Sequence, residues 1–328
     1  RDATEMGCDD RNLGAIGFSQ LQRQRAAREV ARAAMLVEVG RDPPFALNLA
    51  RAPPQMPAAC QQALAAPEGA LADLDGPLLM RVQHLLGILG AYELRRKGLP
   101  VEQLGWAVIR PHFGVFAPTR REYLDLLAEA IAKRRSEGGR CSLAADIGAG
   151  TGVLAAILLH CGVDRVIASD VCWRAAACAT ENLASLGLAD RAVVEESALF
   201  PPALGLGSAD VLVCNPPWLP VPRHAAFDSA VYDGPASEML RGFLGGAAAR
   251  LAQGGEAVVV LSDMAERVGL RSRRELETWI TAAGLRIHDE LRASPQGRRL
   301  RTAKQQAADP LATLRAEEVV FVLRLRAV

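Results

Sequence analysis

Short apolar runs alternate with helical segments from about residue 120 to the end of the chain, and this alternation limits the possible folds more than any other feature. Seven runs read as strands, at residues 141–147, 165–169, 192–195, 209–214, 256–261, 285–291 and 319–325. Segments with helical spacing of apolar residues separate most of them. This order predicts an α/β fold with a doubly wound, mostly parallel sheet. Because a polar loop joins the last two runs, we expect the last strand to be antiparallel.

The first third of the chain has a different pattern. Apolar residues recur at helical spacing in two stretches, Ala26, Val30, Ala33 and Val37, and then Leu78, Val82, Leu85, Leu89 and Tyr92. A proline-rich connector at residues 42–57 separates them, and Gly98 and Pro100 end the second stretch. We therefore predict a mainly helical N-terminal domain at residues 1–110, which can dock a substrate, and an α/β domain at residues 111–328.

A glycine-rich turn follows the first predicted strand. Its residues are Asp146, Ile147, Gly148, Ala149, Gly150, Thr151 and Gly152. Glycine lets the backbone approach a ligand closely and adopt positive φ angles, and open α/β sheets bind ligands at the carboxyl ends of their strands. Asp146 can hold an ammonium group there. Asp170, which ends the second predicted strand, can accept both hydroxyl groups of a ribose.

A second turn, Asn215, Pro216, Pro217 and Trp218, follows the fourth predicted strand directly. Prolines lack the N–H donor that would continue a strand, so they form a rigid turn. The Asn215 amide oxygen and the Pro216 carbonyl can accept both hydrogens of a planar NH₂ group, and the Trp218 ring can stack on its flat face. The turn therefore predicts a site that holds an amide or a base amine and directs its nitrogen.

Together these residues resemble the class I S-adenosylmethionine-dependent methyltransferases, which have a seven-stranded Rossmann-like sheet. The turn at 146–152 is similar to their methionine-binding turn, Asp170 to their ribose-binding acid, and 215–218 to their (N/D)PP(Y/F/W) motif. The resemblance implies S-adenosyl-L-methionine as the cofactor and catalytic roles for residues 215–218. It implies cofactor contacts for Asp146, Gly148, Ala149, Gly150, Gly152, Asp170, Val171, Ser197 and Asn215. Ala198 stands where the family commonly has an adenine-binding Asp, which leaves Ser197, Glu195, Glu196 or the backbone for that contact.

Within this class the chain is most similar to the glutamine N5-methyltransferases of peptide-chain release factors. It is also similar to the small-domain group that includes ribosomal-RNA guanine N2-methyltransferases, and the segment 114–119 resembles both. The resemblance implies methylation of a planar nitrogen, with a protein glutamine amide, such as that of a translation factor, as the first candidate. A base amine of RNA or DNA, guanine N2 or adenine N6, is the alternative. A non-catalytic module that binds S-adenosylmethionine is a third interpretation.

The net charge of +1 hides an uneven distribution of charged residues. Residues 1–110 hold 13 basic and 12 acidic residues, residues 111–264 hold 12 and 17, and residues 265–328 hold 13 and 8. Part of the C-terminal excess is a stretch without acids that carries Arg292, Arg298, Arg299, Arg301 and Lys304. Such a stretch can contact RNA phosphates, although it is also typical of a solvated loop. A nucleic-acid acceptor is therefore compatible with the near-neutral total.

The remaining sequence features indicate what we do not expect. No apolar run is long enough to span a membrane, and the seven cysteines show no metal-binding spacing, so we expect neither a membrane nor a metal as partner. The scattered cysteines favour a reducing compartment, and we predict a cytoplasmic protein. His112, His224, Tyr232 and Asp233 are close to the predicted site in sequence, but we assign them no role. We interpret Cys214 as a small buried residue.

Overall fold

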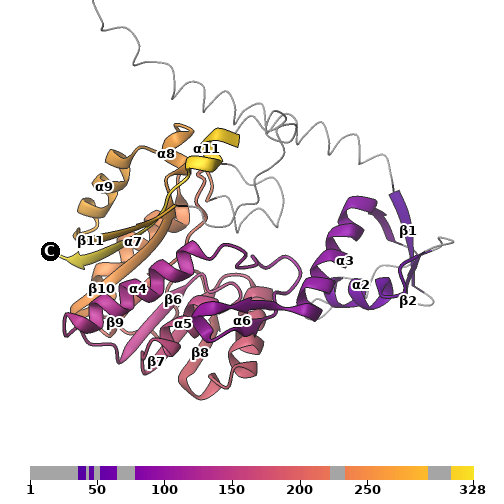
Figure 1. Cartoon of the computed structure of the whole chain (residues 1–328), viewed down its shortest axis with the longest axis horizontal. Helices are drawn as coiled ribbons and strands as arrows, with labels where there is room; N and C mark the ends of the chain where they lie inside the picture. Colours follow the sequence, from indigo (N-terminus) through magenta and orange to yellow (C-terminus); the bar gives the residue numbers. More distant parts are fainter. Residues whose placement is uncertain (1–35, 42–43, 48–51, 65–77, 222–232, 295–311) are drawn as a thin grey trace, which may run out of the picture.

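The computed structural model of the chain describes residues 36–41, 44–47, 52–64, 78–221, 233–294 and 312–328 (Figure 1). One large sheet has the strand order β11-β12-β10-β9-β6-β7-β8. Its strands are β6 (Leu143–Ile147), β7 (Arg165–Asp170), β8 (Ala192–Glu196), β9 (Ala209–Cys214), β10 (Leu251–Ser262), β11 (Leu285–Ala293) and β12 (Val320–Ala327). Only β12 runs antiparallel to its neighbours, β10 and β11. The predicted seven-stranded α/β sheet with an antiparallel last strand is therefore confirmed.

Helices cover both faces of this sheet. One core layer contains residues of α4 (Glu122–Ser136), α5 (Val153–His160) and α6 (Trp173–Ser185), and the other contains residues of α7 (Glu238–Arg250) and α9 (Arg273–Ala282). Strand β9 shows how the layers divide, because Val211 and Val213 face the first layer while Leu212 and Cys214 face the second. Every residue of β9 is buried, as expected for a central parallel strand covered on both faces.

Shorter elements complete the described part of this domain. They are the 3₁₀ turn η2 (Ala189–Arg191) and the helices α8 (Met264–Arg267) and α11 (Ala312–Glu317). Helix α9 begins with a capping box, in which the Ser272 hydroxyl accepts a hydrogen bond from Glu275 N–H and the Glu275 side chain accepts one from Ser272 N–H. None of the helices among the described residues has the length and apolar character needed to cross a membrane.

Besides its helices, the described N-terminal region contains strands that the sequence did not predict. An antiparallel sheet has the order β2-β1-β3 and is formed by β1 (Leu36–Arg41), β2 (Pro44–Leu47) and β3 (Leu78–Arg81). Helical spacing misled here, because Val37 lies in β1 and Leu78 lies in β3, four residues before the helix begins. Pro44 fits β2 because an edge strand tolerates a missing N–H donor.

Two helices and a hairpin complete this region and lead into the large sheet. The helices are α2 (Met56–Leu64) and α3 (Val82–Lys97), and the hairpin joins β4 (Leu99–Val101) to β5 (Ala107–Ile109) through the 3₁₀ turn η1 (Glu102–Leu104). Helix α3 ends as predicted at Gly98, which has a positive φ of 73°. Arg95 on α3 pairs with Glu181 on α6 at 2.7 Å, so α3 contacts the domain of the large sheet (Figure 1).

A buried network of ion pairs ties α4, β10 and β12 together. The side chains of Arg324 and Glu256 are fully buried, and Arg324 Nε donates to Glu256 Oε2 at 2.9 Å. Arg324 Nη2 also donates to Glu137 Oε2 at 2.7 Å, and hydrogen bonds from Arg324 lower the pKa of Glu137 to about 2. Removing one partner of a buried ion pair leaves an uncompensated charge, which is far more costly than the loss of an exposed pair.

We predict that Arg324→Met lowers the free energy of unfolding by about 3 kcal/mol, because Glu256 loses its closest buried partner. The matched control is Arg292→Met, since Arg292 also pairs with a carboxylate on this sheet but its side chain is 64% exposed. This control should change stability by less than about 1 kcal/mol. Urea denaturation followed by circular dichroism measures both, and equal losses in the two variants would contradict the prediction.

Candidate active site

The register of three neighbouring strands places the two predicted turns side by side. Ile147, the last residue of β6, pairs with Ser169 of β7 on one side and with Cys214 of β9 on the other. The residues that follow these three are Gly148, Asp170 and Asn215. Because the strands are parallel, the glycine turn, the predicted ribose acid and the Asn-Pro-Pro-Trp turn meet at one edge of the sheet.

The glycine turn has the conformation that its sequence predicts. Gly148, Gly150 and Gly152 have φ angles of 80°, 55° and 76°, values that residues with a side chain rarely adopt. Gly148 N–H and Ala149 N–H both donate to Ser169 O at 2.8 Å, which fastens the turn to β7. Helix α5 begins directly after it at Val153.

The room available for a side chain differs among the three glycines of this turn. A Cβ atom at Gly152 would lie 3.0 Å from the Cα atom of Ala179 on α6, so the backbone of α6 would have to shift to make room for it. A Cβ atom at Gly148 would collide with the end of the Met239 side chain on α7. At Gly150, no described heavy atom outside the turn lies within 4 Å of that position. Gly152 therefore serves helix packing, whereas the described part of the chain leaves the space beside Gly150 open.

Asp146 is a fully buried carboxyl group with one unused oxygen. Its Oδ2 atom accepts a hydrogen bond from Ala155 N–H at 3.0 Å, whereas Oδ1 has no hydrogen-bond partner among the described residues. Burial raises the pKa of Asp146 to about 7, with a smaller contribution from the Asp170 charge. A buried acceptor without a donor is costly, so this oxygen fits a cationic or hydrogen-bonding ligand group.

Asp170 connects the ends of strands β7 and β8 to the glycine turn. Its side chain accepts from Gly150 N–H at 3.0 Å and from Cys172 N–H at 2.9 Å, and its backbone oxygen accepts from Ser197 N–H at 2.9 Å. Val171 is 71% exposed and Ala198 is exposed. The structure thus brings Asp170, Val171 and Ser197 together beside the glycine turn.

The Asn-Pro-Pro-Trp turn contains a contact that the sequence did not reveal. Pro216 and Pro217 are buried, while Asn215 and Trp218 are partly exposed. The indole N–H of Trp218 donates to Asn215 Oδ1 at 2.9 Å. The ring of Trp218 also packs against both core layers. We predicted Trp218 only as a stacking surface, but its N–H group also holds the amide that we expect to meet the acceptor.

Two residues next to the start of α4 also lie at the site, although no motif pointed to them. The Arg120 guanidinium carbon lies 5.0 Å from the centroid of the Trp218 ring. Tyr123 is buried, and its pKa is raised first by burial and then by the nearby Asp146 charge. In the sequence, Tyr123 has no feature beyond its place on the buried face of α4. No local pattern links Arg120 to Trp218, which lies 98 residues later.

The other residues that lie close to the site in sequence have structural roles where they are described. His112 Nε2 lies 2.9 Å from Glu181 Oε2, and burial lowers its pKa. The Asp233 carboxylate accepts from Met239 N–H and Leu240 N–H in the first turn of α7. Cys214 is buried, as we interpreted it, and burial raises its thiol pKa. His224, Tyr232, Arg298, Arg299, Arg301 and Lys304 lie outside the described residues.

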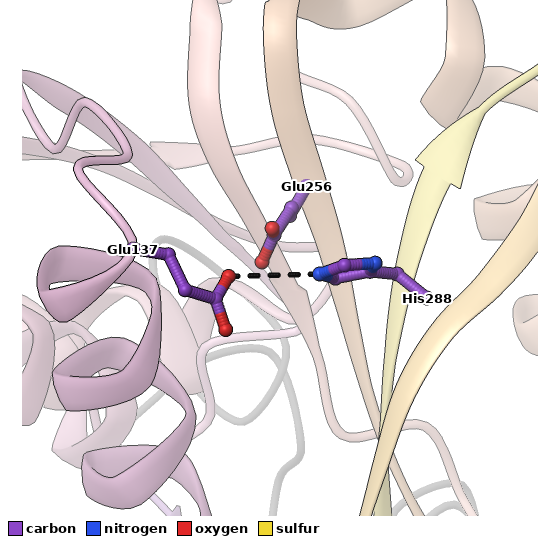
Figure 2. Close-up of side chains that lie close together, drawn as sticks. All are labelled: Glu137, Glu256 and His288. Atoms are coloured by element: carbon purple, nitrogen blue, oxygen red, sulfur yellow. Dashed lines mark ion pairs between the residues drawn. The ribbon is translucent and has the colours of Figure 1, made fainter.

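One cluster of potential metal ligands lies away from these strand ends. Figure 2 shows Glu137, Glu256 and His288, whose ligand atoms lie within 4.8 Å of one another. Both carboxylates are bound by Arg324 and Arg326, and Glu256 is also 3.3 Å from Arg134. Because three guanidinium groups already neutralise the two carboxylates, we interpret the cluster as an ion-pair network that stabilises the fold.

Comparison with protein families decides the class of this site. Residues 108–270 match the sequence model of the methyltransferase small domain family. This region is an S-adenosylmethionine-dependent methyltransferase domain. No curated protein matches the sequence.

Several solved structures resemble the chain that carries this methyltransferase domain. The ribosomal protein L11 methylase of Lactobacillus delbrueckii subsp. bulgaricus is 16% identical, with a TM-score of 0.43 over 68% of this chain and 86% of that chain. The geranyl diphosphate C-methyltransferase of Streptomyces coelicolor A3(2) is 13% identical, with a TM-score of 0.44 over 66% and 87%. A methyltransferase of Geobacter sulfurreducens is 14% identical, with a TM-score of 0.39 over 62% and 91%. Likenesses at this level do not bear on the acceptor.

We predict that Gly152→Ala destabilises the methyltransferase domain more than Gly150→Ala does. Both substitutions force a side chain into a left-handed conformation, which costs about 1 kcal/mol. Only Gly152→Ala also pushes against the Ala179 backbone, so its total loss should reach about 2 kcal/mol or more. Thermal and urea unfolding of the two variants measure the difference, and a larger loss in Gly150→Ala would refute this interpretation of the turn.

Proposed function

We propose that the methyltransferase domain transfers a methyl group to a planar nitrogen, with a protein glutamine amide as the first candidate acceptor. The observation that supports this is the position of Asn215 and Pro216. They follow β9 directly, beside the glycine turn that follows β6. An amide or carbonyl oxygen at that place can accept an N–H group of an acceptor next to the cofactor.

The residues at the strand ends fit S-adenosylmethionine. The buried Oδ1 atom of Asp146 lacks a described donor and suits an ammonium group. The Asp170 carboxylate suits ribose hydroxyls, and the open space at Gly150 suits a closely approaching ligand. When bound, the cofactor supplies an activated methyl group on a sulfonium. The protein's own task is therefore to position the acceptor and exclude water.

Asn215 and Pro216 would orient the acceptor nitrogen and make it more reactive. An amide nitrogen is a poor nucleophile because its lone pair is delocalised. By accepting hydrogen bonds from the two N–H groups, the Asn215 side chain and the Pro216 carbonyl would favour charge on nitrogen in the transition state. The two buried prolines keep this geometry rigid, since proline fixes its own φ angle.

A base amine of RNA or DNA is the second candidate acceptor, because it offers the same planar NH₂ group. The excess of 13 basic over 8 acidic residues in the segment 265–328 favours it. A module that only binds S-adenosylmethionine is the third candidate. The position of Asn215 beside the glycine turn argues against that function. Cofactor binding alone does not need the two hydrogen-bond acceptors that Asn215 and Pro216 place there.

We predict that Asn215→Ala lowers methyl transfer by at least about a hundredfold and leaves cofactor affinity nearly unchanged. Asp170→Ala should do the reverse and weaken S-adenosylmethionine binding, because it removes the ribose-binding carboxylate. Calorimetry measures binding and transfer of a tritiated methyl group measures activity. Parallel loss of binding and transfer in Asn215→Ala would remove the role that we propose for this residue.

The acceptor class is tested with the wild-type protein, tritiated S-adenosylmethionine and fractionated cell extract. Label that protease treatment releases supports a protein glutamine acceptor, and label that nuclease treatment releases supports a base amine. The proposal fails if the protein binds the cofactor and no fraction takes up label.

We predict that the Asp146 carboxyl group makes cofactor affinity depend on pH. Its pKa of about 7 means that the group is mostly ionised at pH 8 and mostly protonated at pH 6, and only the carboxylate pairs with an ammonium. The cofactor affinity of the wild type divided by that of Asp146→Asn should therefore fall about tenfold when the pH is lowered from 8 to 6. The variant corrects for titration of the cofactor's own amine, and a constant ratio would contradict the assignment.

The same carboxyl group should also affect the stability of the protein without cofactor. The folded protein holds this proton more tightly than the unfolded chain, whose carboxyl group has a pKa near 3.8, so this group makes stability fall between about pH 4 and pH 7 and level off above. Urea unfolding of the wild type and Asp146→Asn across this range measures the effect, which the variant should lack.

A further inference from the structure

Arg120, Trp218 and Asn215 form a chain of contacts from the start of α4 to the Asn-Pro-Pro-Trp turn. The Arg120 guanidinium carbon lies 5.0 Å from the centroid of the Trp218 ring, and Trp218 Nε1–H donates to Asn215 Oδ1 at 2.9 Å. A cation over the face of an indole is attracted by its π electrons. The two contacts therefore couple the position of Arg120 to the orientation of the Asn215 amide.

The hydrogen bond from Trp218 decides which end of the amide faces it. An indole N–H can only donate, so it pairs with the amide oxygen and would repel the amide NH₂ group. A flipped Asn215 would place two donors against each other. Since a carbonyl oxygen has two lone pairs, Asn215 Oδ1 can accept from Trp218 and still accept an N–H from an acceptor.

Arg120 is itself held in place by buried carboxylates. Its Nη1 atom donates to Glu318 Oε1 at 2.9 Å, and the same oxygen accepts from the Ser262 hydroxyl at 2.6 Å. Glu318 and Glu122 are each only 4% exposed, and Glu122 lies 3.9 Å from Arg120 Nε. The guanidinium is therefore held by Glu318, which precedes β12, and Glu318 is in turn bound by Ser262 at the end of β10. Arg120 thus restrains the Trp218 ring from a buried part of the domain.

We propose that Trp218 and Arg120 are positioning residues that keep the Asn215 amide oxygen directed toward the acceptor nitrogen. This inference rests on the proposed function, in which Asn215 receives an N–H of the acceptor. It differs from a stacking role for Trp218, because stacking needs only an aromatic ring. The hydrogen-bond role needs the indole N–H itself, so Trp218→Phe separates the two.

The first test is nuclear magnetic resonance of the ¹⁵N-labelled full chain, read at the indole N–H signals of its four tryptophans. Trp218→Phe identifies the Trp218 signal by its loss. We expect that signal to have slow exchange with water, and to shift and exchange faster in Asn215→Ala and Arg120→Met. The Trp279 signal should stay unchanged in both variants. The inference is overturned if the Trp218 signal exchanges freely in the wild type or is unaffected in Asn215→Ala. This test needs no methyl acceptor.

The second test compares initial rates of tritiated methyl transfer into the extract fraction that the wild type labels. We expect Trp218→Phe to lower the rate about tenfold, in keeping with one lost hydrogen bond, with cofactor affinity unchanged. Arg120→Lys, which keeps the cation, should retain more activity than Arg120→Met. The matched controls are Trp279→Phe and Arg241→Met, since Arg241 lies 5.4 Å over Trp279 on helices α7 and α9. We expect wild-type rates from both.

The outcomes separate the inference from the proposed function. Full activity of Trp218→Phe together with an inactive Asn215→Ala overturns the positioning role and leaves the proposed function standing. Full activity of Asn215→Ala contradicts the proposed function itself. Should Trp218→Phe fail to fold, the Trp218 signal is the one that remains after Trp106→Phe, Trp173→Phe and Trp279→Phe have each identified their own. Its exchange rate in the wild type and in the two Arg120 variants then decides the question.

Discussion

Parallel pairing of three neighbouring strands is the constraint on which the site depends. Strand β6 lies between β7 and β9, and its last residue, Ile147, pairs with Ser169 and Cys214. Each strand end then supplies one part of the site. A slip of one residue in β9 would exchange the residues that face the two core layers. The packing that prevents such a slip therefore also fixes the position of Asn215.

The large sheet was predictable because its strands are apolar runs with clear ends. Strand β9 is buried along its whole length, and Asn215 with two prolines ends it. Strand β10 was harder, since it begins at Leu251, five residues before the predicted start, and its pairing with β9 is irregular between Leu251 and Glu256. In the N-terminal region, β1 pairs with β3 across a long sequence separation. Local periodicity carries no information about such a pairing.

The site was predictable where a residue follows a strand directly. Asp146, Asp170 and Asn215 fall in this class, because the end of a parallel strand fixes where the next side chain lies. Arg120 and Glu318 could not be found this way, since their contact joins residues 198 positions apart. Nor could the sequence reveal the hydrogen bond from Trp218 to Asn215, because it depends on the rotamers of both side chains.

The place of β12 between β10 and β11 has a consequence for synthesis of the chain. In the described sheet, β11 has β12 as its neighbour, yet residues 285–293 leave the ribosome before residues 320–327. Arg324 lies on the same late strand, so Glu256 has Arg134 as a partner before Arg324 is synthesised. Strand β12 thus supplies both the pairing partner of β11 and the closest buried cation of Glu256, so neither contact can form before the last described strand has been synthesised.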